Sequence, residues 1–505
     1  MSRVPRNILA NFAGNGWVAL VSLAFVPVYI HFMGIESYGL VGLFTSLYAL
    51  FALLDAGLGT TLNRELARRS TTNDDTRETL DLVRSLECVF WGIAGLAAVA
   101  VAAMAPVITH HWLQPGTLPP AKVQQAITAM SVAMAFQLLT AFYGGGLMGL
   151  QRQVLLNGVK AASATARGVG AVLVLWLVSP TILAFFLWQG VVSGVQAVLT
   201  GWLLWRHLPR ATERRRVSFA LLKKVWRFAA GTAGTVVLGV LLTQMDKIIL
   251  SRLLSLKHFG YYALASVVAM SLYRLVSPIF SAMYPRFTQL VAIGDTEALT
   301  RTYHRGCQLM SVIVLPLAAL IALFSDEVLM LWTRDPAIVT HTAPILSLLI
   351  IGTALNATMN LPYAIQLAYG WTRLGMLTNL AAVAILVPLV YVLARAYGAV
   401  GAATGWVLLN LAYLLITPHL MHRRLLVGEK LAWYWTDLGA PVLAVAVSAS
   451  LCRWALPEVT TPLATSLTLA TAFSLIGFAG IAAMPELRHF VMNRVRRLRR
   501  IPIMP

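Results

Sequence analysis

Long apolar runs, separated by short polar and basic segments, follow one another along the whole chain. A bilayer core about 30 Å thick is crossed by about 20 apolar residues in a helix that rises 1.5 Å per residue. Runs of this length predict an all-α polytopic membrane protein with about fourteen transmembrane helices and no substantial soluble domain. The predicted spans are 7–32, 39–63, 83–107, 123–149, 154–178, 180–205, 226–250, 259–284, 306–331, 342–368, 375–394, 399–421, 437–456 and 463–484.

The positions of lysine and arginine predict the orientation of these spans. With the N-terminus in the cytoplasm, 30 of the 39 basic residues lie in inside segments and 6 lie in outside loops. Inside loops of membrane proteins carry an excess of Lys and Arg. The bias also requires an even number of spans, because the basic C-terminal run must lie inside. We therefore expect both termini in the cytoplasm.

The largest basic inside segment, 206–227, follows six spans and divides the chain. A short internal repeat supports this division, since Tyr38-Gly39 opens the second span and Phe259-Gly260 opens the eighth. Two six-helix lobes of the same orientation would be related by an axis along the membrane normal, although chance similarity between apolar hairpins is the alternative. The expected organisation is an N-terminal lobe at 1–206, a basic cytoplasmic linker at 207–225, a C-terminal lobe at 226–424, two extra transmembrane helices at 425–485 and a basic cytoplasmic tail at 486–505.

Composition and motifs narrow the function. The chain is 58% hydrophobic and 11% charged, whereas soluble domains are about a quarter charged. The net charge is +20, but the basic residues lie between the predicted spans, so they indicate membrane topology and not nucleic-acid binding. The three cysteines, Cys88, Cys307 and Cys452, lie far apart and are expected to be buried apolar residues. No phosphate-binding loop or HExxH motif is present, and the His110-His111 pair lacks further ligands nearby, so we expect no cofactor, no metal and no ATP-driven pump.

Charged residues inside the predicted spans are the main candidates for function. A charge in mid-bilayer costs roughly 2.5–3.5 kcal/mol, so it should face protein or water. Arg167 and Arg274 lie deep in the fifth and eighth spans, and we expect them to line a hydrated cavity, with structural ion pairs as the alternative. Lys160 lies about two helical turns before Arg167 on the same face. It either joins that cavity or extends to the cytoplasmic headgroups.

Uncharged polar residues repeat at helical spacing on two other spans. Asn11 and Asn15 step by four along the first span, and Asn356 and Asn360 do so along the tenth. Together with the cations they indicate a net-positive path for an anionic ligand, although interhelical hydrogen bonds explain these residues equally well. Asp55, in the second span, is a candidate coupling carboxylate.

Two further features have structural interpretations. Gly144-Gly145-Gly146, followed by Gly149, predicts close helix packing, and Asp246-Lys247 reads as an interfacial pair. The longest outside loop, at 110–122, is too short to hold a folded catalytic apparatus. This argues against an enzyme such as a membrane polysaccharide polymerase or ligase.

Several segments of the chain resemble the polysaccharide flippase family, of the O-antigen type, within the multidrug/oligosaccharidyl-lipid/polysaccharide exporter superfamily. The likeness extends over roughly residues 5–425, and it depends on the order and spacing of the segments. They are 33–39 (MGIESYG), 53–59 (LLDAGLG), 63–67 (NRELA), 149–152 (GLQR), 246–250 (DKIIL), 260–262 (GYY) and 398–403 (GAVGAA).

The resemblance implies a function in transport. The expected cargo is an undecaprenyl-diphosphate-linked oligosaccharide, moved across the bacterial cytoplasmic (inner) membrane by alternating access for O-antigen-like polysaccharide biosynthesis. The expected partners are membrane lipids, H⁺ or Na⁺ as a coupling ion, and polysaccharide assembly proteins. A cation-coupled multidrug exporter of the same superfamily is the alternative, but such cargo favours buried acids, and cations predominate in these spans.

Overall fold

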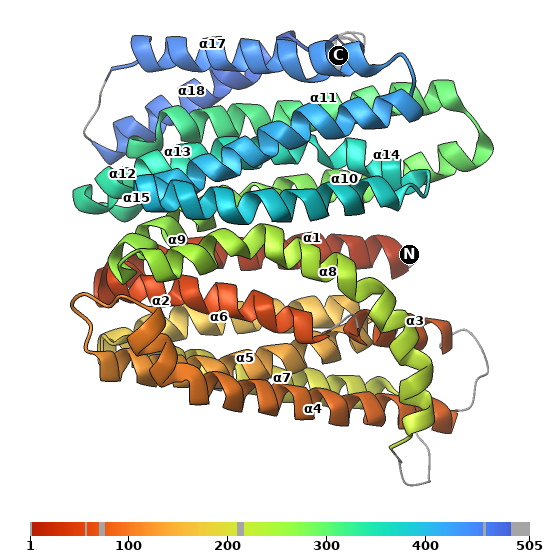
Figure 1. Ribbon diagram of the computed structural model, residues 1–505, viewed down its shortest axis with the longest axis vertical. Coiled ribbons are helices and arrows are strands. Elements are labelled where there is room, and N and C mark those ends of the chain that lie inside the picture. Colours follow the sequence, from red (N-terminus) through yellow and green to blue (C-terminus); the bar gives the residue numbers. More distant parts are fainter. Residues whose placement is uncertain (1–2, 56–57, 70–75, 210–216, 458–460, 486–505) are drawn as a thin grey trace, which may run out of the picture. The chain divides into compact units, whose positions relative to one another are not determined.

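The computed structural model describes residues 3–55, 58–69, 76–209, 217–457 and 461–485, and the secondary-structure elements in this part of the chain are helices (Figure 1). It divides into two compact units, unit 1 (Met1–Ala263) and unit 2 (Leu264–Pro505). The helices of unit 1 and its boundary are α1 (Arg3–Ala24), α2 (Val26–Asp55), α3 (Leu58–Arg69), α4 (Thr76–Val107), the π-helix η1 (Ile108–Trp112), α5 (Pro120–Gly149), α6 (Gln153–Leu177), α7 (Ile182–His207), α8 (Phe219–Leu253) and α9 (Leu256–Ser271). Those that follow are α10 (Tyr273–Ile293), α11 (Thr296–Leu323), α12 (Ser325–Thr333), α13 (Pro336–Thr358), α14 (Asn360–Ala368), α15 (Thr372–Arg424), α16 (Lys430–Ala432), the π-helix η2 (Trp433–Gly439), α17 (Ala440–Ala455) and α18 (Pro462–Ala482).

Helix lengths and composition confirm an all-α polytopic membrane protein. Eleven helical segments in the described part are long and apolar enough to cross a membrane, and Ala13–Ala24 is a shorter apolar helix. The 53-residue α15 contains two passages, because its backbone leaves helical geometry at Gly398 (φ 60, ψ −140). Tyr413 donates a hydrogen bond to Asn379 Oδ1 at 2.6 Å, so the two parts of α15 run antiparallel. The eleventh and twelfth predicted spans are therefore the two arms of α15.

The start of the chain differs in detail from the predicted spans. α2 leaves helical geometry at Gly34 (φ 80, ψ 160) and ends at Asp55, so the predicted second span, 39–63, is too long. Its last part belongs to α3, a separate amphipathic helix that ends in Arg68 and Arg69. Leu58 and Leu62 extended the apolar run in the sequence, but they are the buried face of α3. Hydropathy does not distinguish such a face from the end of a span.

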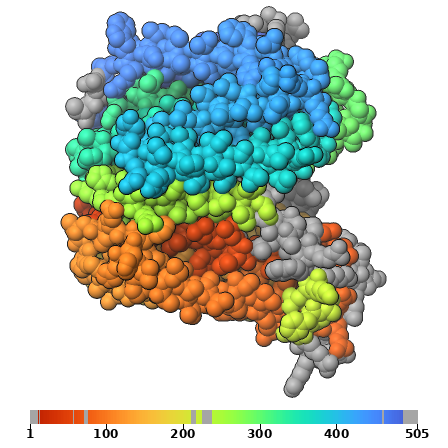
Figure 2. Space-filling model, viewed as in Figure 1, coloured from red at the N-terminus to blue at the C-terminus, as the bar shows by residue number. Residues whose placement is uncertain are grey.

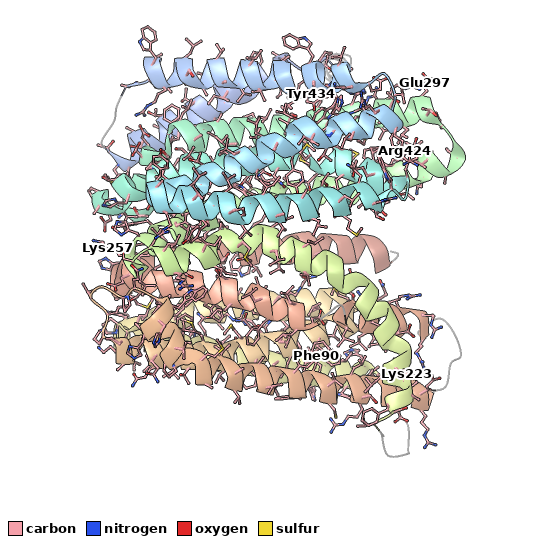
Figure 3. The ribbon with its side chains drawn as sticks, in the orientation of Figure 1. Phe90, Lys223, Lys257, Glu297, Arg424 and Tyr434 are labelled. Carbon is pink, nitrogen blue, oxygen red and sulfur yellow. The ribbon has the colours of Figure 1, made fainter. Side chains whose placement is uncertain are left out.

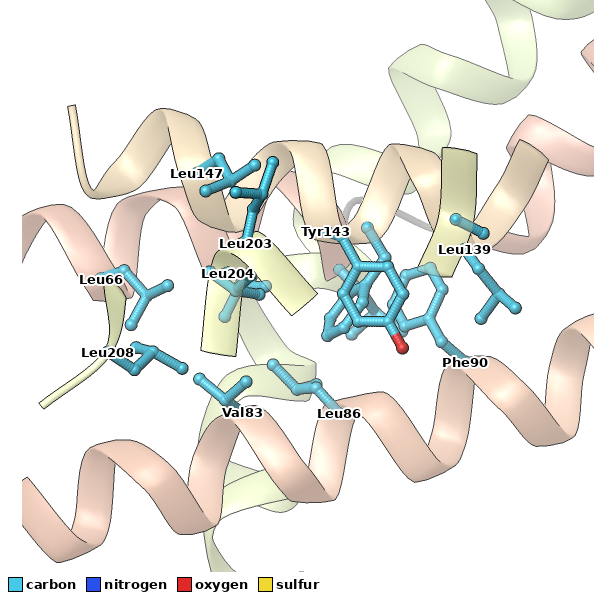
Figure 4. Close-up of a cluster of buried hydrophobic side chains, with 14 of the residues drawn as sticks. Leu66, Val83, Leu86, Phe90, Leu139, Tyr143, Leu147, Leu203, Leu204 and Leu208 are labelled. Atoms are coloured by element: carbon cyan, nitrogen blue, oxygen red, sulfur yellow. The ribbon is translucent and has the colours of Figure 1, made fainter. Parts of the chain in front are cut away.

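Unit 1 is built around α5, whose glycines allow neighbouring backbones to approach closely. A Cβ atom on Gly145 would lie 2.7 Å from the carbonyl oxygen of Gly59, and one on Gly149 would lie 2.5 Å from that of Asn63. The predicted close packing at these glycines is confirmed, with α3 as the partner. A core next to this contact includes Phe90 stacked on Phe142, together with leucines of α3, α4, α5 and α7 (Figure 4).

Unit 2 has α11 near its centre, packed against α13 and against the hairpin of α17 and α18 (Figure 1). Val445, Ala472 and Ile476 from this hairpin join Leu315 and Leu320 of α11 in one apolar core. α15 and α17 form much of the visible face of unit 2 in Figure 2. Large apolar side chains lie exposed on both, including Ile385 (61%) and Val447 (58%). Such a surface suits lipid and not water.

Candidate functional site

Arg167 lies on α6 and points at α7. Its Nη2 donates to Gln196 Oε1 at 2.7 Å and to Ser193 Oγ at 3.2 Å, both on α7. Ser193 is fully buried and Gln196 is 5% exposed, so the guanidinium group lies inside the helix bundle of unit 1. Near this point α6 and α7 pack closely, because Gly170 of α6 leaves room for the Trp188 side chain of α7, while Gly168 does the same for Phe25.

The charge of Arg167 has no acidic partner among the residues that the structure describes. Its two hydrogen-bond acceptors are neutral, and its buried Nε atom has no partner there at all. An arginine presents five donors in a planar fork, and here most of them are left for another group. The structure therefore keeps a positive charge inside unit 1 without neutralising it.

Lys160 lies seven residues before Arg167 on the same helix. It is half-buried, and in the described part of the chain it forms no hydrogen bond or ion pair. The spacing of nearly two turns places the two cations on one face of α6, about 10 Å apart along the axis. Two unneutralised cations on one helix face favour an anionic ligand.

The asparagines of the first span have a different role. Asn11 on α1 donates to Gln153 Oε1 at 3.1 Å on α6, and Asn157 donates to Asn11 Oδ1. Asn15 is exposed. Asn11 thus joins α1 to α6, which is the interhelical hydrogen bonding that the sequence left open as an alternative.

Asp55 stands where α2 ends and α3 begins. Its Oδ1 accepts a hydrogen bond from the backbone N–H of Gly59 at 2.8 Å. The first N–H groups of a helix lack intrahelical partners, so this carboxylate satisfies one of the free donors of α3. Asp55 therefore caps the start of α3. This role alone explains its presence, without any role in coupling transport to an ion.

A second polar network joins three helices in unit 2. Asn356 on α13 accepts a hydrogen bond from the Tyr273 hydroxyl of α10 at 2.7 Å and donates to Asn410 Oδ1 of α15 at 2.7 Å. Asn360 donates to the carbonyl of Asn356 at 3.1 Å, one turn back in its own chain. Arg274, next to Tyr273, is exposed. The structure thus places the predicted Asn356 in a hydrogen-bonded network that joins α10, α13 and α15.

The two repeat motifs meet each other directly. A Cβ atom on Gly39 would collide with the carbonyl oxygen of Leu256, and one on Gly260 would collide with that of Ile35. The repeat that aligns Gly39 with Gly260 also aligns Ile35 with Leu256, so these two contacts are equivalent. The same repeat aligns Gly42 with Ala263, and a Cβ atom on Gly42 would lie 2.5 Å from the Ala263 methyl group. A local two-fold relation between α2 and α9 produces this reciprocal pattern.

Sequence reasoning missed the role of Glu36, which lies just before this crossing and is 8% exposed. Its carboxylate accepts hydrogen bonds from the backbone N–H groups of Gly116 at 2.6 Å and Thr117 at 3.0 Å, and from the Thr117 hydroxyl. The same loop binds the start of α9, because Leu256 N–H donates to the Gln114 carbonyl at 3.0 Å. In the sequence, the sign that could have identified this role was the position of Glu36 between Gly34 and Gly39 in the 33–39 motif.

Sequence reasoning also missed a cluster in unit 2 formed by His304, Glu429 and the buried Asp437. His304 Nδ1 lies 2.5 Å from Asp437 Oδ2, and His304 Nε2 lies 3.1 Å from Glu429 Oε2. Asp437, 1% exposed, also accepts from Gln308 at 2.9 Å. Figure 3 labels Tyr434 in the same π-helix, η2. In the sequence, the only sign of this cluster was Asp437, an acid within an apolar run. Its partner His304 lies 133 residues away in the chain.

The described residues contain no group of three or more His, Cys, Asp or Glu arranged to hold a metal ion. All three cysteines are free, with Cys307 and Cys452 buried as expected. Cys88 is exposed, because it lies on the outward face of α4, so the expected burial is wrong for this residue.

Comparisons with known proteins agree with this architecture. The model of the family described as "Polysaccharide biosynthesis protein" matches residues 4–291, and the MatE model matches residues 232–392. A Shigella flexneri protein named as an O-antigen transporter is 20% identical over 404 residues, covering 80% of this chain and 94% of its own length.

Solved structures share the fold. A lipid II flippase MurJ structure in an inward closed conformation has a TM-score of 0.71 at 12% identity, covering 93% of this chain and 97% of its own. A multidrug resistance transporter of the MATE family in an inward-facing conformation has a TM-score of 0.65 at 15% identity, covering 83% and 94%. At these identities the likeness concerns the fold alone. The match over 4–291 covers more than half of the chain, which therefore belongs to the polysaccharide biosynthesis protein family of multi-pass membrane proteins.

Proposed function

We propose that this protein is a flippase that moves an undecaprenyl-diphosphate-linked oligosaccharide across the bacterial cytoplasmic membrane by alternating access, for the synthesis of an O-antigen-like polysaccharide. Family membership and the O-antigen transporter named above support this function. We place both termini in the cytoplasm, on the basis of the lysine and arginine bias. Polysaccharide assembly proteins are its proposed partners in the membrane.

The observation on which the proposal rests is the unneutralised charge of Arg167. A cation that is retained inside a membrane bundle needs a compensating partner. Gln196 and Ser193 orient the guanidinium group but do not offset its charge. A diphosphate provides both the negative charge and the acceptor geometry that an arginine fork matches. Lys160, on the same helix face, would add a second contact, and Arg274 of unit 2 is the third proposed cation.

Alternating access requires two halves that move about a defined contact. The fold shared with a flippase in an inward closed conformation and a transporter in an inward-facing conformation supports this mechanism. We propose H⁺ or Na⁺ as the coupling ion and Asp55 as the candidate coupling carboxylate, acting in addition to its contact with Gly59. Asn15 and Asn360 are proposed to line the polar path.

A cation-coupled multidrug exporter is the second candidate, favoured by the match of the MatE model to residues 232–392. Export of cationic drugs requires acids that are free to bind them. In the described residues of unit 2, the most buried acid, Asp437, is already bound to His304 and Gln308. This arrangement favours an anionic cargo.

The deciding experiment measures flipping by purified protein in proteoliposomes that contain a defined diphosphate-linked oligosaccharide. Wild type should expose the sugar to an external lectin or glycosidase, and Arg167→Ala should not. Arg167→Lys should keep part of the activity, because the charge stays while the two-pronged hydrogen bonding is lost. Lys122→Ala, which removes an exposed charge at the start of α5, is the matched control.

Stability and drug transport complete the test. Thermal unfolding of Arg167→Ala should match that of wild type; a collapse that accounts for the lost activity would make the arginine structural. Full flipping by Arg167→Ala would remove this residue from the substrate path. Accumulation of a cationic dye by the same proteoliposomes, with no flipping, would favour the exporter.

A further inference from the structure

Two carboxylates and an imidazole form a row in unit 2, apart from the cations discussed above. Glu429, in the turn before α16, lies at one edge of the His304 ring on α11, and Asp437 of η2 lies at the other. The exposed fraction of the side chain falls from 34% at Glu429 to 13% at His304 and 1% at Asp437. Exposed Arg423 and Arg424 precede this turn, which is typical of an aqueous membrane face. The row therefore leads from water at Glu429 into the helix bundle.

The two contacts of His304 require more protons than a neutral imidazole carries. Nδ1 lies 2.5 Å from Asp437 Oδ2 and Nε2 lies 3.1 Å from Glu429 Oε2, so a hydrogen must lie between the atoms of each pair. An ionised carboxylate only accepts, and a neutral imidazole has one N–H. The second hydrogen makes the ring an imidazolium or one of the acids a carboxylic acid. In either form the row holds one proton more than a neutral histidine with two ionised carboxylates.

The charged and titratable groups around the row come from α11, α15, α16 and η2. They are Tyr303, the exposed Arg305, the buried Cys307, His422, Lys430 and Tyr434. His422 Nδ1 donates to the Pro418 carbonyl at 2.8 Å, and its Nε2 accepts from the Tyr303 hydroxyl at 3.3 Å. This second ring is therefore satisfied when it is neutral, whereas His304 with its two carboxylates needs the extra proton.

Asp437 also fastens η2 to α11. Its Oδ1 accepts from Gln308 at 2.9 Å, and its main-chain carbonyl accepts from the Ser311 hydroxyl at 2.7 Å. η2 is a π-helix of seven residues, a conformation that is rare and is often found at functional sites. α17 continues directly from η2 and packs against α18. The row thus connects a titratable group to the attachment of the whole C-terminal hairpin.

We propose that Glu429, His304 and Asp437 form a proton-binding site that controls how firmly η2 and the hairpin of α17 and α18 are attached to α11. The row holds one proton in the attached state and releases it to water through Glu429 when the attachment loosens. The two carboxylates lie at opposite edges of one ring, so the three groups do not converge on a metal ion. In the orientation proposed above, Glu429 faces the cytoplasm, so the hairpin responds to cytoplasmic pH.

The direction of the response follows from the proton count. Above about pH 6.5 a free imidazole is neutral, so the loosened state has a neutral His304 and two ionised carboxylates. The attached state still holds one more proton, and raising the pH therefore favours the loosened state, by up to about tenfold per pH unit.

Hydrogen exchange of the detergent-purified full chain, measured by mass spectrometry from about pH 5 to pH 9, tests the proposal in the range that brackets histidine titration. Peptides of η2 report on the attachment, and peptides of α5 in unit 1 are the internal reference. After correction for intrinsic exchange rates, protection of η2 should fall by up to about tenfold per pH unit above about pH 6.5, while that of α5 stays constant. Protection of η2 that is constant or rises with pH would overturn the proposal.

Glu429→Gln separates proton binding from packing. A glutamine amide donates to Nε2 of a neutral imidazole, whose Nδ1–H still reaches Asp437, so the variant needs no extra proton. Protection of η2 in Glu429→Gln should remain near the wild-type value at low pH and lose its pH dependence. His304→Gln should lower protection already at low pH. If His304→Gln folds poorly, Glu429→Gln still decides the question.

Glu297→Gln is the matched control, because Glu297 is an exposed carboxylate in the first turn of α11. This variant should keep the wild-type pH dependence of η2. A pH dependence that persists in Glu429→Gln would assign the response to another group, such as His422, and would contradict the proposed site. Loss of the pH dependence in Glu297→Gln would contradict it as well.

Discussion

At the residue scale, polar side chains inside the helices differ in whether the protein itself satisfies them. Asn356 and Asn11 have partners on neighbouring helices, which is sufficient reason for their presence. Arg167 has neutral partners only, so its charge remains available to a ligand. The same residue types thus have structural roles at some positions and a proposed binding role at another.

Asp55 offers a direct test of capping against coupling. Asp55→Ala removes the acceptor for Gly59 N–H and should lower the free energy of unfolding by about 0.5–2 kcal/mol. Asp55→Asn keeps an oxygen at that position and should remain close to wild type in thermal unfolding. If Asp55 also couples an ion, Asp55→Asn should lose the effect of an imposed H⁺ or Na⁺ gradient on flipping. A gradient effect equal to that of wild type would leave capping as its only role.

Glu36 should control the order of the loop at residues 113–119. Glu36→Ala leaves the backbone donors of Gly116 and Thr117 without their carboxylate, at about 1–3 kcal/mol for each unsatisfied group. We expect faster hydrogen exchange at these amides in Glu36→Ala. Glu36→Gln, which keeps one acceptor oxygen, should show a smaller increase. Exchange that is unchanged in Glu36→Ala would show that other contacts hold the loop.

At the element scale, two contacts between distant segments define the fold: the crossing of α2 and α9, and the attachment of η2 and α17 to α11. The first depends on having no side chain at glycine positions. The second depends on buried hydrogen bonds, since Asp437 accepts from Gln308 and its carbonyl accepts from Ser311. Neither is a local property of one helix.

The crossing predicts equal effects at equivalent positions. Gly39→Ala and Gly260→Ala should each destabilise the protein by about 1–3 kcal/mol, because each methyl group meets a backbone carbonyl that cannot move aside easily. Chemical denaturation in detergent measures the change. Gly92→Ala and Gly95→Ala, which meet no atom within 4 Å, should be neutral or slightly stabilising. Strongly different effects of Gly39→Ala and Gly260→Ala would contradict the two-fold relation.

The histidine cluster predicts a large loss from a single change. His304 has a carboxylate at each ring nitrogen, Asp437 at Nδ1 and Glu429 at Nε2, and a protonated imidazole donates to both. His304→Ala leaves the buried Asp437 without its histidine partner, and we expect the free energy of unfolding to fall by about 3–5 kcal/mol. Glu429→Gln, at a partly exposed carboxylate, should cost about 1 kcal/mol or less. A similar decrease in the free energy of unfolding in both variants would show that the contribution of each carboxylate does not depend on its burial.

At the scale of the whole molecule, the lysine and arginine bias makes a prediction that is independent of any site. A reporter active only in the cytoplasm should give signal when fused after Arg216 and after Pro505. The same reporter fused after Arg395 should be silent, because that position is predicted to lie outside. Silence at either of the first two positions would break the proposed orientation.

Features that depend on neighbouring residues in the chain could be predicted from the sequence, whereas contacts between distant segments could not. The apolar runs correctly predicted the membrane class and the two arms of α15, because hydropathy is summed along a contiguous segment. The end of the second span was misplaced, since the buried face of α3 continues its apolar run. Arg167 was singled out because an isolated charge in a span is visible without its neighbours. His304 was not, because an ordinary residue near a helix start becomes notable only beside Asp437.

The sequence by itself determined that this chain is an all-α membrane protein, because the cost of placing polar groups in lipid acts on each segment separately, and the order of its short motifs indicated the family. It also determined which spans contain charge. Only the tertiary structure decided which of those groups are satisfied, since the partners of Asn11, Asn356 and Asp437 come from helices distant in the chain. The reciprocal contacts of Gly39 and Gly260 likewise exist only once α2 and α9 cross, because close packing is a property of two surfaces and not of one run of residues.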